Sequence, residues 1–224
     1  MSGAPFTAAW LWLAVVASGL YHGLSPGMGW PLAVSAGLME RRPRALFLAF
    51  WPLSVGHLLA ILLMLLPFAL LLALAEWQRV IQILAALLVI GYGIFRLFQP
   101  RHPRALARIR PAQLGLWSFA IAIAHGAGLM LVPIYLGLCG TPAHAHDLAV
   151  PLATANLTMA MLVAIVHVAA MLAAGGCMAW LVYRYLGLKF VSRSWFNLDT
   201  SWAVSLVVVG AVALAFNLAN AASG

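Results

Sequence analysis

Long apolar stretches separated by short polar segments run through the whole chain. A helix of roughly 20 apolar residues crosses a bilayer, and windows of that kind predict six spans. The spans run over Phe6–Leu38, with an internal break, and over Leu46–Ala75, Val80–Phe98, Leu114–Leu138, Ala153–Val182 and Trp202–Leu218. The pattern therefore predicts an all-α membrane protein with six transmembrane helices.

Composition agrees with this interpretation. Hydrophobic residues make up 65% of the 224 residues and charged residues only 7%, far from the proportions of a soluble domain. The sequence has no Walker loop, no Cys-x-x-Cys pair and no helical His-Glu-x-x-His motif. We therefore expect a protein whose main partner is the lipid bilayer and which is not an enzyme.

The net charge of +8 comes from basic residues that gather in alternate loops. Since short loops rich in Lys and Arg stay cytoplasmic, these loops should face inward and both termini outward, in a bacterial inner membrane. The membrane topology accounts for the positive charge, so we expect no nucleic-acid partner. The loops follow the first, third and fifth spans and contain Arg41, Arg42 and Arg44; Arg96, Arg101, Arg104, Arg108 and Arg110; and Arg184, Lys189 and Arg193.

The topology predicts a single membrane domain made of two three-helix halves, residues 1–100 and residues 101–224. The first three spans begin outside and the last three begin inside, so similar halves would form inverted repeats. The two cysteines, Cys139 and Cys177, should lie toward opposite faces of the membrane, which argues against a disulfide between them.

The two halves share a motif in which a His-Gly pair precedes a methionine and then a proline. The first copy starts at His22 and runs to Pro31, and the second starts at His125 and runs to Pro133. The second span of each half carries a further histidine, His57 in one and His167 in the other. Histidine inside a membrane is costly and typical of a functional site, so we expect these four rings to meet near the middle of the bilayer.

Imidazole and thioether groups suit nickel, cobalt, zinc or copper, and thioethers favour monovalent copper. The predicted metal ligands are His22, His57, His125, His167, Met28 and Met130. A second, weaker expectation concerns the start of the last span, where Asp199 and Asn197 could couple proton movement to transport. An acid there could equally cap the helix N-terminus.

Glycines and prolines beside the histidines predict unwound or sharply bent helices. Proline removes a backbone hydrogen bond within a helix, and broken helices in transporters expose backbone groups to a substrate. The residues expected to form gates are Gly23, Pro26, Gly27, Gly29 and Pro31 in the first half, and Gly126, Gly128 and Pro133 in the second.

The motif His22-x-x-x-Pro26-Gly27-x-Gly29 resembles the first-helix motif of the NicO and RcnA-like nickel/cobalt exporters, a branch of the LysE-type transporter superfamily. The resemblance implies six spans arranged as two inverted three-helix repeats, and export of a metal ion. In those exporters an acid typically precedes the proline and a second histidine follows the glycine. In this chain Ser25 and Met28 stand at those places.

Three functions follow from these patterns. The first is transport of a transition-metal ion through a midplane histidine site. The second, from the superfamily resemblance, is export of a small amino acid or organic solute, with the histidines binding a carboxylate or relaying protons. The third is a haem-binding electron-transfer subunit, since paired histidines can hold haem axially. Homo-oligomerisation is compatible with all three.

Overall fold

The structure is a computed structural model that describes residues 4–71, 78–98, 113–139, 149–186 and 198–222. Within those ranges every regular element is a helix. In chain order they are α1 (Ala4–Leu24), the 3-10 turn η1 (Pro26–Met28), α2 (Trp30–Glu40), α3 (Pro43–Leu71), α4 (Gln78–Phe98), α5 (Leu114–His125), α6 (Ala127–Leu138), α7 (Ala149–Leu181), the π-helical turn η4 (Val182–Leu186) and α9 (Leu198–Ala222).

Several of these helices are long and apolar enough to cross a membrane. Continuous spans of this kind lie at Pro43–Leu70, Val80–Phe98 and Ala155–Leu186, and α5 and α6 together form a fourth if the bent pair is one span. Shorter apolar helices occupy Ala8–Leu24 and Ala203–Ala219. The all-helical prediction is confirmed for the described residues, and up to four helical segments are long and apolar enough to cross a membrane.

Both predicted helix breaks are present. α1 ends at Leu24, two residues after His22, and α2 begins only after the η1 turn and Gly29, whose φ of 102° is left-handed. α5 ends at His125, and Gly126, with a φ of 73°, separates it from α6. The two parts of this second span meet at a bend of 62°. Left-handed backbone favours glycine, which explains why a glycine stands at each break.

Local hydrogen bonds satisfy much of the backbone at the first break. The amides of Ser25, Met28 and Gly29 donate to the carbonyls of His22, Ser25 and Pro26 at 3.1, 3.1 and 3.4 Å. The indole Nε1 of Trp30 donates to the Leu24 carbonyl at 3.2 Å. Because backbone groups need partners in an apolar environment, these bonds make the break a defined structure.

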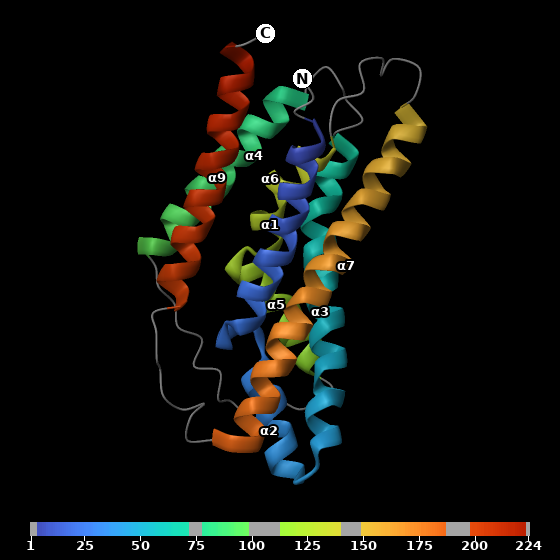
Figure 1. Cartoon of the computed structure of the whole chain (residues 1–224), viewed down its shortest axis with the longest axis vertical. Coiled ribbons are helices and arrows are strands. Elements are labelled where there is room, and N and C mark those ends of the chain that lie inside the picture. Colours follow the sequence, from blue (N-terminus) through green and yellow to red (C-terminus); the bar gives the residue numbers. More distant parts are fainter. Residues whose placement is uncertain (1–3, 72–77, 99–112, 140–148, 187–197, 223–224) are drawn as a thin grey trace.

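Helices of the two halves cross over one another. α1 packs along α7, and α5 packs along α3, so the first helix of each half lies against the second helix of the other. α4 and α9 form a third close pair and meet the remaining helices mainly through α6. In Figure 1 α1 runs downward whereas α5 and α6 run upward, and the start of α1 and the end of α9 lie at the same end of the molecule.

Glycines allow these crossings to be close. A Cβ on Gly19 or Gly23 would collide with the α7 backbone at His167 or Met171, and a Cβ on Gly56 would collide with the Gly115 carbonyl of α5. Small residues let the backbones of membrane helices approach in this way. The contacts hold the segments that carry the histidines against one another.

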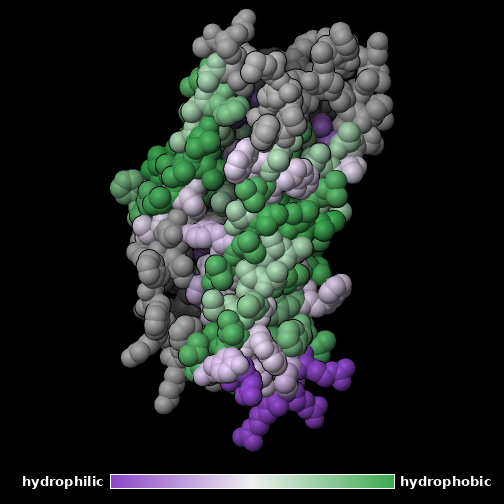
Figure 2. Space-filling view, viewed as in Figure 1, coloured by the Kyte–Doolittle hydropathy of each residue, from purple (hydrophilic) through white to green (hydrophobic). Residues whose placement is uncertain are grey.

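The visible face of the described residues is largely apolar, with charged residues at one end. Figure 2 shows hydrophobic residues over much of the visible surface and hydrophilic residues gathered at the end where α2 meets α3. There Arg41, Arg42 and Arg44 are exposed. Arg184 is also exposed, in η4, which packs against α2 at this end. We call this region the basic end.

The two cysteines, Cys139 and Cys177, are both free thiols and form no disulfide.

The glycine contacts make a stability prediction. Replacing Gly56 with Ala should force α3 away from α5 and lower the free energy of unfolding by about 1–3 kcal/mol, the cost of overpacking a tight interface. The matched control is Gly91→Ala, because nothing lies within 4 Å of a Cβ at Gly91. Thermal unfolding of the detergent-purified variants measures both, and equal midpoints would contradict the predicted close contact.

Candidate functional site

Three of the predicted histidines pack ring against ring between three helices. His22 of α1, His57 of α3 and His167 of α7 form a triangle with ring centroids 5.1, 5.3 and 5.9 Å apart. The exposed fractions of the three side chains are 0%, 1% and 0%. We call this group the histidine triangle. It lies in the interior of the helix bundle, and its members come from both halves of the chain.

The histidine triangle lies far from the basic end. His57 is 14 residues after Pro43, the first residue of α3, and His167 is 14 residues before Leu181, the last residue of α7. At 1.5 Å per residue both distances are about 21 Å. The histidine triangle therefore lies well inside these two helices and away from their ends at the basic end.

A serine orients one ring of the triangle. The Ser18 hydroxyl donates to the Val15 carbonyl at 2.9 Å and lies 2.9 Å from Nδ1 of His167. A hydroxyl has one proton to donate, so the Ser18 oxygen must accept from His167. The proton of the neutral ring therefore resides on Nδ1, and Nε2 of His167 carries a lone pair.

Two further ring nitrogens of the histidine triangle have no hydrogen-bond partner among the described residues. They are Nε2 of His57 and Nε2 of His167, and both are buried. A buried polar atom that lacks a partner costs free energy, and such atoms in a native structure are typical of binding or catalytic sites. The triangle is therefore able to accept a proton or to donate lone pairs to a cation.

His125 lies at the second helix break and faces the first. Its Nδ1 is 3.1 Å from the carbonyl of Ile121, which can only accept, so Nδ1 carries the proton and Nε2 has the lone pair. A Cβ built on Gly27 would lie 3.6 Å from that Nε2 and 3.9 Å from the Ser25 hydroxyl. The two breaks are thus next to each other, with Gly27 of the first in van der Waals range of His125 at the second.

The donor atoms of these histidines do not converge on one point. Across the ranges that the structure describes, no group of three or more His, Cys, Asp or Glu side chains has the arrangement needed to hold a metal ion. The rings of His57 and His167 are stacked with an interplanar angle of 9°, and His22 meets both edge-on. Binding of a metal at the triangle would require the rings to rotate.

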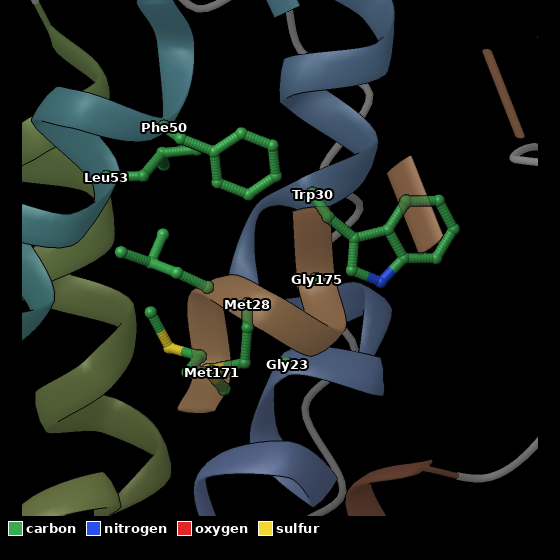
Figure 3. A pocket seen from close by; sticks show the side chains of 8 residues that line it. Gly23, Met28, Trp30, Phe50, Leu53, Met171 and Gly175 are labelled. Carbon is green, nitrogen blue, oxygen red and sulfur yellow. The ribbon is translucent and has the colours of Figure 1, made fainter. Parts of the chain in front are cut away.

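The methionines predicted as ligands fall in different places. Met28, in η1, lines a pocket beside the triangle (Figure 3). Met130 is buried in another apolar cluster, with Val89 and Leu206. Met28 therefore lines this pocket, whereas Met130 does not.

The predicted gate residues divide between the breaks and helix interiors. Pro26 and Gly27 lie in η1, and Gly29 and Gly126 are the left-handed residues of the two breaks. Pro31 is in the first turn of α2. By contrast, Gly23 lies within α1, and Gly128 and Pro133 lie within α6.

The predicted coupling residues lie at the start of α9. Asp199 is the second residue of that helix, and its side chain is outside the described part of the structure. Asn197 lies outside the described residues altogether.

Two buried serines were missed by the sequence analysis. Ser18 of α1 binds His167 of α7, and the Ser118 hydroxyl of α5 donates to the Leu53 carbonyl of α3 at 2.7 Å. Each serine links the first helix of one half to the second helix of the other. Ser18 stands four residues before His22, on the same helix face, and that spacing is a signal that could have identified it.

Comparison of the chain with protein families, with curated proteins and with solved structures found no match. The resemblance to the nickel/cobalt exporters therefore stays a prediction.

The hydrogen bond between Ser18 and His167 can be tested directly. His167 also has a backbone hydrogen bond to Val15, so Ser18→Ala should lower the population of the Nδ1–H tautomer without abolishing it, whereas Ser18→Thr keeps the hydroxyl and the Nδ1–H form. Nitrogen-15 chemical shifts of labelled histidine report the tautomer. If a metal ion binds the His167 ring, Ser18→Ala should also weaken metal binding by about 10-fold or more, because a supporting hydrogen bond to the ligand is lost. An identical tautomer population in Ser18→Ala would contradict the assignment.

Proposed function

We propose that this protein is a transporter of a bacterial inner membrane that carries a transition-metal ion through the histidine triangle. The single observation that carries the proposal is the convergence of three buried imidazoles from α1, α3 and α7, two of which hold an Nε2 without a partner among the described residues. Intramembrane ionisable groups are rare and mark substrate or ion pathways.

The spacing of the rings suits a shared metal ion. With metal–nitrogen bonds of about 2.1 Å and tetrahedral geometry, imidazole centroids around one ion lie about 5 Å apart. The centroids of the triangle are 5.1 to 5.9 Å apart. Rotation of the rings about their side-chain bonds, without movement of the helices, would therefore bring the donor atoms toward one centre.

The other two functions fit the geometry less well. A haem held between His57 and His167 would need the space between these rings, yet His22 lies within 5.3 Å of both centroids. A carboxylate solute would need amide donors, yet the amides of Ser25, Met28, Gly29 and Gly126 already bond to local carbonyls. Both observations favour a cation as the substrate.

The arrangement of the halves supports a design of two inverted repeats with six spans. The first helices of the two halves run in opposite directions (Figure 1), and each packs on the second helix of the other half. Transporters built in this way hold their substrate at the interface of the repeats. The basic end would face the cytoplasm under the positive-inside rule, which puts both termini outside.

The two breaks would supply the moving parts. Gly29 and Gly126 have left-handed φ values and interrupt the helices that carry His22 and His125. Hinges are a few residues at the ends of elements that absorb changes in φ and ψ. A change at these glycines would open the triangle toward one side or the other, while the lone pairs of the imidazoles hold the ion.

Transport in a defined system tests this function. Purified protein in liposomes that contain a metal-responsive dye should admit one or more of nickel, cobalt, zinc and monovalent copper or silver. Since the triangle supplies the ligands, His22→Ala, His57→Ala and His167→Ala should each reduce the initial rate at least about 10-fold, the loss seen when even a supporting group of a metal site is removed.

Tyr135→Phe is the matched control. It removes another buried polar atom, a hydroxyl that bonds the Asn156 carbonyl at 3.1 Å, from a helix outside the triangle, and it should transport at the wild-type rate. Equal metal transport by the wild type and the three histidine variants, or no metal transport by any of them, would refute the proposal. Efflux of an amino acid that chelators leave unchanged would point to the solute alternative.

A further inference from the structure

A small pocket lies between α1, η1, α2, α3 and α7. Figure 3 shows it from close by, with residues of α1, η1, α2, α3 and α7 around it. The lining residues are Gly23, Met28, Trp30, Phe50, Leu53, Met171, Leu172 and Gly175. None of these eight side chains is charged, and two of them carry a thioether.

The positions along the helices place this pocket one turn from the triangle. Met171 follows His167 by four residues on α7, and Leu53 precedes His57 by four residues on α3. Residues four apart lie on the same helix face, and in both helices the step of about 6 Å leads toward the basic end. Met28 reaches the pocket from the break that follows His22.

The chemistry of the lining restricts the cation that it can accept. Thioether sulfur is a soft ligand that selects monovalent copper, whereas nickel, cobalt and zinc are better served by imidazole and oxygen groups. The Trp30 ring adds an aromatic face, and aromatic faces attract cations. A charged oxygen ligand, which a hard divalent ion would require, is absent from these eight residues.

We propose that Met28 and Met171 form a second metal position of the transport pathway and that it selects a soft monovalent ion, Cu(I) or Ag(I). This inference rests on the proposed function and specifies its substrate class. The ion passes between the imidazoles of the triangle and the two thioethers, which lie between the triangle and the basic end. Both methionines are buried, at 8% and 6% exposure, so the ion is away from water at this position.

Met130 gives an internal comparison within the same chain. It is as buried as Met28, at 8% exposure, but it packs against Val89 and Leu206 and does not line the pocket. Exchange of Met for Leu keeps most of the volume of the side chain and removes the sulfur. Met130→Leu therefore measures the effect of losing a buried methionine that has no role in metal binding.

The experiment uses silver ion, a soft monovalent probe that needs no reductant, with nickel and zinc as hard and borderline probes. Binding to purified full-length protein is measured by equilibrium dialysis, and uptake is measured in liposomes. We expect the wild type to bind silver more tightly than nickel or zinc. The double variant Met28→Leu/Met171→Leu should lose silver affinity by about 10-fold or more, and Met130→Leu should match the wild type. Circular dichroism and thermal midpoints establish that each variant is folded.

The outcomes separate this inference from the proposed function. Two results would overturn the assignment of Met28 and Met171 as a metal position. One is a loss of silver affinity in Met130→Leu as large as in the double variant, and the other is an unchanged silver affinity in the double variant. Transport of nickel or zinc in preference to silver, still lost in His22→Ala, would overturn the inference and leave the proposed function standing. Absence of any metal transport would overturn both.

Discussion

The burial of three imidazole rings in an apolar bundle is the constraint on which the other features of this protein depend. Each ring carries nitrogen atoms that need partners, and lipid or aliphatic side chains supply none. The histidine triangle is accommodated because α1 and α7 approach closely at Gly19 and Gly23, and α3 and α5 approach closely at Gly56, where any Cβ would collide with a neighbouring backbone. Ser18 satisfies one nitrogen of His167, so the close crossing also brings the hydrogen-bond partner to the ring.

The two helix breaks are consistent with the same constraint. The first break begins two residues after His22 and the second directly after His125, and in each a glycine takes up a left-handed conformation. At the first break, local turns and the Trp30 indole bind the backbone groups that a continuous helix would have satisfied. At the second, the ring of His125 points its Nε2 at Gly27 of the first. The first break also brings Met28 to a pocket that Met171 of α7 lines as well.

The crossing of the halves explains how a weak internal similarity produces one site. α1 lies on α7 and α5 lies on α3, so neither half contains a complete site: His22 and His57 come from the first, and His167 and His125 from the second. The pair α4 and α9 carries none of these histidines and meets the rest mainly through α6.

The sequence by itself predicted the helices, several of them long and apolar enough to cross a bilayer, the two helix breaks and four histidines in apolar stretches. Apolar length and the backbone preferences of glycine and proline act locally, so a local pattern records them. Only the tertiary structure decided which side chains meet. Met28 and Met130 occupy equivalent places in the two motifs, yet one lines the pocket and the other packs with Val89 and Leu206. The roles of Ser18 and Met171 likewise depend on the face that α1 and α7 turn toward each other. The faces that α1 and α7 turn toward each other are set by contacts between glycines of α1 and carbonyls of α7 that are more than 100 residues apart in sequence. No local sequence pattern records such contacts.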